Sequence, residues 1–527
     1  MSWLSSFKLI MSDVISFRGK VKVTRWCNAR PLNGKYETLH GRAIASISCR
    51  NFDICRHVPL KLLYIEAKIG IRSCEVVYLK DDVKVVLIGA GSLTFTPSLL
   101  KGLALSDMAR DASLTISLVD INPEILEVMY KVGVKLIEAL RRRGEAGELK
   151  IEKHVERKEA LEGADFVIIT IGVGGVKATH VDVEVPRRYG IEQTVGDTVG
   201  PGGIMRALRH VPVLLDIARD MEDLCPEAYM FNYSNPLTPL TRVVQRETKI
   251  KAYGLCTGVF GVKWYLAKYF NVRPDDVEIY VGGINHLYWI IDFSVKGEPG
   301  YQLIEKKLAK EGVPDRGEIA ITLKLYRIFG LIPAPGGRHV AEFFPHLFMH
   351  EEAMKKYDIP RFPEGTIYDY KLREPFEKLL KGIASGERSV DELLKVKGLE
   401  EEGIGVVRLM EAIALDKRIL FPGINVPNKG VIANLPSWGV VEVPAYVDAT
   451  GVHPLNMGPL PKAIAGILTQ RLAQYEITID AALSGDRSLA LQALLMDGYV
   501  RSIDIAERLL DDMLRAEQEW LPSCWFK

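Results

Sequence analysis

Two side chains suited to binding a transition metal lie in glycine-containing segments near the middle of the chain. Cys256 lies in GLCTG, and His286 follows in GGINHLYW. A thiolate and a neutral imidazole are both good ligands for a divalent transition metal. Two ligands are too few to diagnose a metal site, and a buried cysteine or histidine is more often a packing residue. If the pair binds a metal, substrate and water must supply the remaining ligands.

A glycine-rich turn nearer the N-terminus has the composition of a nucleotide-binding loop. Gly89-Ala-Gly91-Ser92 directly follows a short apolar run, and Asp120 ends the next apolar run. Glycines there let the backbone approach a pyrophosphate, and the N-terminus of a following helix attracts negative charge. Asp120 can accept hydrogen bonds from a ribose diol and repels a 2′-phosphate, which favours NAD. Because Thr94 replaces the third glycine of the usual fingerprint, an ordinary strand–helix turn is the alternative.

Two further polar segments carry groups that suit a substrate or cofactor. Asn235 in NYSNP can bridge a nicotinamide or a sugar hydroxyl, although an ordinary Asn-Pro turn is equally consistent. GRHVAEFFPHLFMHEE lacks the helix spacing of a metalloprotease, which indicates that most of its titratable residues are structural. His339 beside Arg338 is the exception, because we expect this pair to face a cleft. The titratable residues of the segment besides arginine include His339, Glu342, His346 and His350.

The elements that must hold these residues alternate between strand and helix. Short apolar runs rich in β-branched residues predict buried parallel strands, and an apolar stripe through Val128, Val132 and Leu136 predicts an amphipathic helix. This alternation predicts an α/β fold with a Rossmann-type doubly wound parallel sheet. The expected strands are 83–89, 114–120, 164–172 and 229–236, the expected helices are 97–108, 123–143 and 205–224, and the mixed-charge stretch 141–159 is expected to be a solvated face.

Beyond about residue 260 the pattern is mixed, which predicts an α+β domain that completes the site, as in lactate and malate dehydrogenases. Strand is expected at 280–295, strand and turn at 426–448, mostly helical segments at 305–329 and 460–519, and a loop-rich segment at 333–348. The expected division is an N-terminal extension at 1–82, a NAD-binding domain at 83–260, and a catalytic, substrate-binding and oligomerisation domain at 261–527.

The N-terminal extension differs in composition from the rest of the chain. Four of the seven cysteines lie in residues 1–82, at spacings that fit no paired zinc-knuckle pattern. The segment has no clean helical or strand period. We therefore expect a poorly ordered extension, with a metal-binding module as the alternative.

Charge and hydropathy exclude several classes of protein. The chain has 527 residues with 68 Lys+Arg against 67 Asp+Glu, a formal net charge of +1, which argues against nucleic acid or an anionic membrane as the main partner. It has no run of about 18 apolar residues and no signal-peptide pattern at its start. An odd number of cysteines at low density suits a reducing cytoplasm.

Taken together, the segments resemble glycoside hydrolase family 4, the NAD- and metal-dependent glycosidases. The resemblance runs from about Val83 to about residue 515, in the order and at about the spacing of the family. It leaves 1–82 unmatched. The segments that carry it are KVVLIGAGSLTFTPSL, VDINPE, GADFVIITIGVGG, RRYGIEQTVGDTVGPGGIMRALRHVPV, NYSNPLTPLTR, GLCTG, GGINHLYW, RHVAEFFP and VEVPAYVD.

The resemblance implies a glycosidase mechanism outside the two-carboxylate scheme. NAD⁺ oxidises C3 of the sugar to a ketone, which acidifies the proton at C2. A base removes that proton while the metal polarises the C2 and C3 oxygens. The glycosidic bond then breaks by elimination, water adds, and the hydride returns, so that no net redox change occurs.

Matching the family's motifs assigns roles to residues of this chain. Cys256 and His286 match the metal ligands, with Mn²⁺ the usual metal, and Asp197 in GDT matches an acid close to the metal and the leaving group. Asp197 is therefore the candidate general acid or metal partner. Some members carry an acid directly after the metal cysteine, where this chain has Thr257, a poor general acid. The resemblance assigns nucleotide binding to Gly89, Gly91, Ser92, Asp120 and Asn235, and substrate binding to Asn235 and Asn285.

The C2 base departs from the family pattern. Some members use a tyrosine in the region that here reads RHVAEFFP, which contains no tyrosine. His339 is the closest titratable replacement, and Tyr326 in LKLYRIFG is the second candidate.

The expected substrate is a small α-glycoside: an α-galactoside, an α-glucoside or an α-hexuronide. Phospho-glycosidase members carry an arginine-rich stretch where this chain offers only Lys177 and His180, which lowers the expectation of a phosphosugar. Arg338 could make a bidentate contact to a C6 carboxylate, so a hexuronide is included. Members are generally oligomeric, and the long C-terminal helices suit a homo-oligomer, either a dimer or a tetramer.

Two alternatives belong to other functional classes. A NAD-dependent 2-hydroxyacid dehydrogenase would share the fold but release stoichiometric NADH, and would need an arginine and a His-Asp pair for its chemistry. A catalytically silent nucleotide-binding or redox-sensing protein would cleave no glycoside at all.

Overall fold

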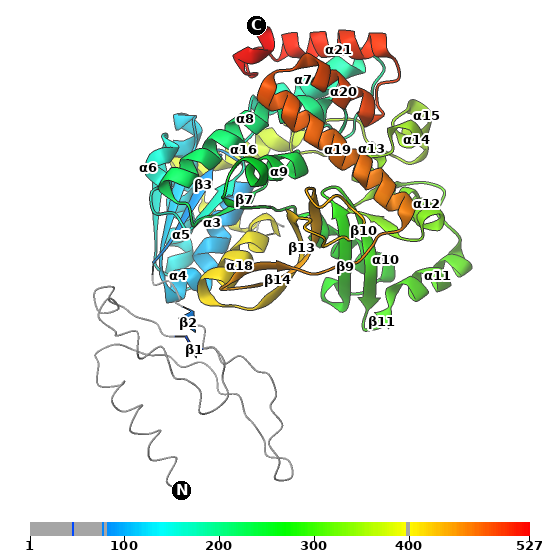
Figure 1. Ribbon diagram of the computed structural model, residues 1–527. Coiled ribbons are helices and arrows are strands. Elements are labelled where there is room, and N and C mark those ends of the chain that lie inside the picture. The colour runs from blue at the N-terminus through cyan, green and yellow to red at the C-terminus, as the bar shows by residue number, and fades with distance from the viewer. Residues whose placement is uncertain (1–44, 47–75, 78–81, 397–400) are drawn as a thin grey trace, which may run out of the picture.

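A sheet of 13 strands runs through the structure and carries helices along it (Figure 1). The structure, a computed structural model, describes residues 45–46, 76–77, 82–396 and 401–527. The expectation for the N-terminal extension therefore lies outside the described residues except at Asp82 and two short parallel strands. These are β1 (Ala45–Ser46) and β2 (Val76–Val77).

One half of the large sheet is parallel and doubly wound. The chain starts at the centre with β3, winds outward through β4 and β5, returns to β6 beside β3, and winds the other way through β7 and β8. The order β8-β7-β6-β3-β4-β5 is that of a Rossmann fold, so the predicted fold class is confirmed. The strands are β3 (Asp82–Ile88), β4 (Ser113–Val119), β5 (Leu149–His154), β6 (Phe166–Ile169), β7 (Tyr229–Asn232) and β8 (Lys251–Gly254).

Of the three helices predicted for this half, α5 begins at its predicted residue, whereas α3 begins at Phe95 and α8 at Gly200, before their predicted starts. In α5 (Pro123–Arg142) the Asn122 side chain accepts hydrogen bonds from the first backbone N–H groups, and Pro123 suits the first turn because it lacks an N–H. Val132 and Leu136 of the predicted stripe are buried, whereas Val128 is half-buried. The other helices of this half are α3 (Phe95–Leu105), α4 (Asp107–Asp111), α6 (Arg157–Leu161), α7 (Gly175–Arg187), α8 (Gly200–Leu224) and α9 (Leu237–Glu247).

The other half of the sheet is antiparallel. The chain contributes β9 (Val277–Ile284) and β10 (Leu287–Val295) as a hairpin, and later β13 (Ile419–Pro427) and β14 (Val440–Asp448) as a second pair. This confirms the strand expected at 280–295 and the strand and turn expected at 426–448, although β13 begins earlier, at Ile419. Shorter strands extend it: β11 (Glu298–Pro299), β12 (Ile332–Ala334) and β15 (Gly451–Pro454).

The two halves join through the second pair. Asn425 of β13 pairs with Gly254 of β8, and Glu442 of β14 pairs with Gly283 of β9. A Cβ on Gly254 would lie 2.6 Å from the Thr241 hydroxyl and 3.0 Å from Cβ of Asn425, so only glycine allows this approach. The sheet thus crosses the predicted boundary at residues 260 and 261 without a break, and the division into two domains stays a prediction.

Helices pack beside the antiparallel half of the sheet, and the last helices of the chain lie at the top of the view in Figure 1. The predicted helical stretch at 460–519 is confirmed as three helices, α19 (Lys462–Ser484), α20 (Arg487–Asp497) and α21 (Ile503–Ala516). Within the described ranges, no helix is long and apolar enough to cross a membrane. The remaining α-helices are α10 (Gly258–Phe270), α11 (Gly300–Glu311), α12 (Glu318–Phe329), α13 (Gly337–Glu342), α14 (Pro345–Phe348), α15 (Glu351–Lys356), α16 (Tyr370–Ser385), α17 (Val390–Leu394) and α18 (Glu401–Leu415).

Two segments differ from the sequence prediction. The stretch 141–159 is not only a solvated face, because it contains the edge strand β5. Exposed and half-buried residues do not alternate regularly along β5, so its sequence lacks the period of a strand. The segment 333–348, predicted as loop-rich, contains the short helices α13 and α14. Helices this short carry too few turns to show a period in the sequence.

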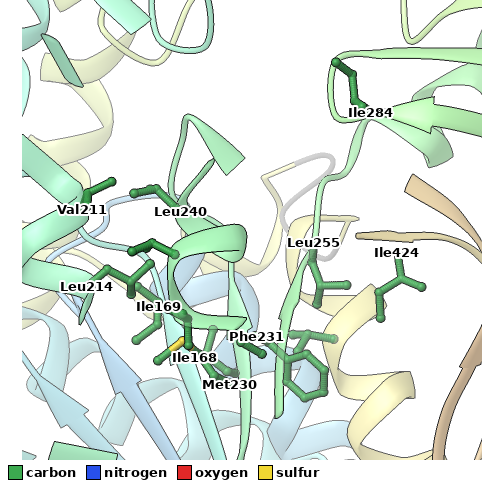
Figure 2. Close-up of a cluster of buried hydrophobic side chains, with 14 of the residues drawn as sticks. Ile168, Ile169, Val211, Leu214, Met230, Phe231, Leu240, Leu255, Ile284 and Ile424 are labelled. Carbon is green, nitrogen blue, oxygen red and sulfur yellow. The ribbon is translucent and has the colours of Figure 1, made fainter. Parts of the chain in front are cut away.

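The hydrophobic core continues across the junction of the two halves. Figure 2 shows a cluster to which β6, β7, α8 and α9 contribute, with Leu255 lying between Phe231 of β7 and Ile424 of β13. Phe231, at the centre of this cluster, has no solvent-exposed surface. The core therefore holds the ends of β7 and β8, from which site residues project.

Replacing Phe231 by alanine is expected to lower the free energy of unfolding by about 3–5 kcal/mol, because it leaves a cavity that the surrounding strands cannot fill. Urea denaturation checks this. Ile121→Ala is the control, since Ile121 is 91% exposed, and its effect should stay within about 0.5 kcal/mol. Equal midpoints for both variants would contradict the assignment of Phe231 to the core.

Candidate active site

Polar residues from six segments gather where the parallel strands end. The loops after β3, β4, β7 and β8 carry Gly89, Asp120, Asn235 and Cys256, and carboxyl ends of parallel strands share one edge of the sheet. The β9–β10 hairpin and the segment before α8 add His286 and its neighbours. This is the edge at which ligands bind in open α/β sheets.

Cys256 and His286 face each other across the junction of the sheet. The Cys256 Sγ lies 3.4 Å from Nε2 of His286 and accepts a hydrogen bond from the backbone N–H of Gly258 at 3.3 Å. Burial raises the pKa of the thiol to about 12, with a contribution from the Glu442 carboxylate. A cation beside the sulfur would reverse this shift by stabilising the thiolate.

His286 occupies a two-residue hairpin loop. Ile284 pairs with Leu287, so Asn285 and His286 alone connect β9 to β10. His286 has a φ of +66°, a left-handed conformation that is uncommon for a histidine. Burial lowers the pKa of the imidazole, which keeps the ring neutral and able to offer a lone pair. Strain at such a position is typical of a functional residue.

Asp197 lies beside this pair and is held at both of its carboxylate oxygens. The Thr198 hydroxyl donates to Oδ1 at 2.7 Å, and the Asn235 amide donates to Oδ2 at 3.0 Å. The same Thr198 oxygen lies 3.0 Å from Nδ1 of His286. Asn235, Asp197, Thr198 and His286 therefore form one connected chain that ends at Cys256.

His339 also reaches the pair. Its ring packs edge-on against that of His286, with centroids 4.7 Å apart. Burial, together with the neighbouring His286, lowers the pKa of His339 to about 3. The ring is therefore neutral at ordinary pH and can accept a proton.

Glu342 fixes the segment that leads to Asp197. Its Oε1 accepts hydrogen bonds from the consecutive backbone N–H groups of Thr194, Val195 and Gly196, at 2.8, 2.8 and 3.1 Å. Burial raises the pKa of Glu342 to about 7, although the three N–H donors by themselves lower it. Arg338 donates to the carbonyl oxygen of Thr194 at 2.5 Å, and its Nε is buried with no hydrogen-bond partner among the described residues.

Asn285 turns its side chain toward a buried acid. Its amide donates to Oε2 of Glu442 at 3.1 Å, and its Oδ1 has no hydrogen-bond partner within the part of the chain that the structure describes. Burial raises the pKa of Glu442 to about 7. The Tyr288 hydroxyl is likewise buried without such a partner. Polar atoms that lack a partner inside a protein are expected to meet a ligand or water.

The glycine loop after β3 packs closely against Asp120 and the segment after β6. The Gly91 N–H donates to Oδ2 of Asp120 at 2.7 Å, and a Cβ on Gly91 would lie 2.7 Å from that same oxygen. Gly89 has a φ of +91°, and a Cβ there would meet the Thr170 backbone at 2.6 Å. The Ser92 hydroxyl accepts from the Phe95 N–H at 3.4 Å, at the start of α3. These residues fit a dinucleotide, with Asp120 placed for a ribose.

The thiol and imidazole fit a metal with two protein ligands. Among the described residues no group of three or more His, Cys, Asp and Glu side chains could hold a metal ion. The Cys256–His286 pair alone supplies soft and borderline donors that face each other, so a metal there leaves positions open for a substrate.

Tyr326, the second candidate for the base, is directed elsewhere. Its hydroxyl donates to Oε1 of Glu305 on α11 at 2.6 Å, and its ring stacks on that of Tyr301. Burial and Glu305 raise its pKa to about 12. The structure thus brings together the other predicted catalytic, substrate and metal residues and leaves Tyr326 outside this cluster.

Sequence reasoning missed Thr198, Glu442 and Tyr288, and gave Glu342 no role. An isolated acid in the apolar strand sequence of β14 is a signal for Glu442, because a buried charge needs a partner. A hydroxyl directly after Asp197 gives no such signal. Its role depends on His286, which is distant in the sequence.

The chain matches two family profiles in succession. The profile described as family 4 glycosyl hydrolase matches residues 84–272, and the profile of the family 4 glycosyl hydrolase C-terminal domain matches residues 281–500. Together they cover most of the chain and both halves of the sheet.

Characterised relatives and solved structures agree with the profiles. The Bacillus subtilis alpha-galactosidase is 33% identical over 449 residues, which cover 84% of this chain and 99% of that protein. The B. subtilis alpha-galacturonidase is 33% identical and covers 82% of this chain and 97% of its own length. A solved structure of B. subtilis lplD superposes with a TM-score of 0.72 at 30% identity, over 82% of this chain and all of the other.

Replacing Glu342 by alanine is expected to lower the free energy of unfolding by at least about 3 kcal/mol, because three buried N–H groups lose their acceptor at about 1–3 kcal/mol each. Urea denaturation measures the loss. Glu351→Ala, an exposed acid in α15, is the control and should change it by less than about 0.5 kcal/mol. A Glu342→Ala protein as stable as the control would contradict the anchoring of this segment.

Proposed function

The chain belongs to family 4 of the glycosyl hydrolases, and from that premise we propose that it hydrolyses α-linked glycosides with the help of NAD⁺ and a divalent metal, Mn²⁺ being the first candidate. The observation that carries the proposal is the facing pair of Cys256 and His286, with neutral His339 packed against it. The glycine loop and Asp120 lie at the same edge of the sheet.

Each bound group would be held by residues of this chain. Gly89, Gly91 and Ser92 cradle the pyrophosphate, and Asp120 accepts from the ribose. Cys256 and His286 ligate the metal. When bound, NAD⁺ supplies a hydride acceptor and the metal supplies a Lewis acid for sugar oxygens.

His339 is the proposed base for the proton at C2 of the sugar. Its ring packs edge-on against that of His286, with centroids 4.7 Å apart, which places it beside the proposed metal ligands. A base must lie within hydrogen-bond reach of the proton it removes. Tyr326 is not proposed as the base, because its hydroxyl donates to Glu305 and lies outside the cluster around Cys256 and His286.

Asp197 and two asparagines orient the substrate. The carboxylate of Asp197 accepts from Asn235 and Thr198, and lone pairs remain on both oxygens for a substrate hydroxyl or a leaving-group proton. Asn285 offers its Oδ1, which has no protein partner among the described residues. These groups exclude water from one side of the sugar and fix its position.

The sugar is proposed to be an α-galactoside, an α-glucoside or an α-hexuronide. Relatives at about a third identity include an alpha-galactosidase and an alpha-galacturonidase, and an alpha-glucosidase from Erwinia rhapontici is 31% identical. The Nε of Arg338, which is buried with no hydrogen-bond partner in the described part of the chain, favours a carboxylate on the substrate. His180 stacks on Tyr370 and contacts the Tyr368 carbonyl, so it is poorly placed to bind a phosphate.

The proposed chemistry also bears on where and how the protein works. A thiolate ligand at Cys256 must stay reduced, which supports a cytoplasmic location. A homo-oligomer is proposed as well, a dimer or a tetramer, which light scattering of the purified protein measures.

Removal of the cofactors should abolish hydrolysis. With aryl α-glycosides as substrates, chelation or removal of NAD⁺ is expected to lower the rate at least about 100-fold, because the Lewis acid or the hydride acceptor is then missing, and loss of one second-shell partner alone costs about 10–100-fold. Adding back Mn²⁺ or NAD⁺ should restore the rate. No net NADH should accumulate during turnover, which a 340 nm recording checks. Stoichiometric NADH with a 2-hydroxyacid, or an undiminished rate without NAD⁺ and metal, would refute the proposal.

His286→Ala should reduce the turnover of the best aryl α-glycoside at least about 100-fold, since it removes one of two protein ligands to the metal. The control is His350→Ala, because His350 is exposed and lies outside the site. Full activity of the His286 variant would exclude the proposed metal site.

Arg338→Gln should discriminate between substrates. Loss of a charge-assisted contact is expected to raise KM for an α-hexuronide about tenfold or more and to leave KM for a neutral α-glycoside within about threefold. The comparison uses initial rates for both sugars on both proteins. Equal changes in KM for the two substrates would show that Arg338 does not contact the C6 group.

A further inference from the structure

The Thr198 hydroxyl lies between two groups that constrain its single proton. Its Oγ1 is 2.7 Å from Oδ1 of Asp197 and 3.0 Å from Nδ1 of His286. Thr198 is 4% exposed, so water has little access to replace either contact. Both contacts must therefore be satisfied by protons that the three side chains themselves carry.

With Asp197 ionised and His286 neutral, only one arrangement of these protons satisfies both contacts. A carboxylate only accepts, so the hydroxyl proton must point at Asp197. The oxygen of Thr198 then has lone pairs left for His286, and Nδ1 must be the nitrogen that carries a proton. A neutral imidazole has one N–H, so the other nitrogen, Nε2, keeps its lone pair. That nitrogen faces the Cys256 sulfur at 3.4 Å.

We propose that Thr198 is a positioning residue that fixes His286 as its Nδ1–H tautomer and so presents the Nε2 lone pair to a divalent metal beside Cys256. The inference rests on the proposed function, because it presumes that this pair holds a metal. In the opposite tautomer, two lone pairs would face each other or the Thr198–Asp197 hydrogen bond would break.

The surroundings of Thr198 hold it in this orientation. Asp197 is itself anchored by the Asn235 amide at 3.0 Å. Gly203 on the first turn of α8 packs against the Thr198 backbone so closely that a Cβ there would lie 2.4 Å from the carbonyl carbon. A β-branched side chain also restricts rotation about the Cα–Cβ bond. The hydroxyl is therefore oriented before any metal arrives, which lowers the ordering cost of binding.

The test measures Mn²⁺ affinity rather than activity. Thr198→Val keeps the shape of the side chain and removes the hydroxyl, whereas Thr198→Ser keeps the hydroxyl. Titration calorimetry of Mn²⁺ into the NAD⁺-loaded full chain should give a dissociation constant about 10–100-fold weaker for Thr198→Val, the size of a lost second-shell contact, and within about threefold of wild type for Thr198→Ser. The NAD⁺ affinity of both variants should equal that of wild type.

A matched control separates this role from a general loss of packing. Thr478 in α19 is 1% exposed, and its hydrogen bonds to described residues lie within its own helix, to Gln474. Thr478→Val should leave the Mn²⁺ affinity unchanged. His286→Ala tests the metal site itself and should abolish Mn²⁺ binding.

The possible results separate the two proposals. Wild-type Mn²⁺ affinity in Thr198→Val would overturn the role of Thr198, as would equal weakening in Thr198→Ser. Loss of NAD⁺ binding together with Mn²⁺ binding in Thr198→Val would also overturn it, since a structural role then accounts for the defect. Unchanged Mn²⁺ binding in His286→Ala would instead refute the proposed metal site.

Discussion

The pairing of β13 and β14 between β8 and β9 is the constraint on which the site depends. Asn425 pairs with Gly254 on one side, and Glu442 pairs with Gly283 on the other. Cys256 follows β8, and His286 follows β9, so these two pairings set how far apart the thiol and the imidazole lie. Glycine at both positions lets the strands and their neighbours approach closely. A Rossmann sheet alone would supply the nucleotide loop but only one of the two proposed metal ligands.

Burial and hydrogen bonding then prepare the site for its proposed ligands. Low solvent access keeps His286 and His339 neutral, so that His286 can offer a lone pair to a cation. Burial also raises the pKa of the Cys256 thiol, a shift that a cation beside the sulfur would reverse. Glu342 fixes the backbone before Asp197, and Asp197 in turn holds Thr198 and Asn235. Most of the orientation is therefore built into the folded chain before a sugar binds.

Local pattern predicted four of the six parallel strands, β3, β4, β6 and β7, because a buried parallel strand is a short apolar run between turn residues; β5 and β8 were not predicted. The prediction of the site depended on the order of short motifs, and the resemblance to family 4 supplied the roles of Cys256 and His286. The edge strand β5 was missed because its burial pattern is mixed, and Thr198 was missed because its partner lies far along the chain. Contacts that cross the sheet junction leave no local signal in the sequence.

The exchange of hydrogen at C2 of the sugar tests the central claim most directly. The proposed chemistry removes the C2 proton in every turnover and returns one from the site, so a reaction in D₂O should give a product sugar with deuterium at C2, detected by proton NMR. Each released sugar is expected to carry this label when NAD⁺ and Mn²⁺ are present. A glycosidase that works by direct displacement would release an unlabelled sugar, and that result would contradict the account given for Cys256, His286 and His339.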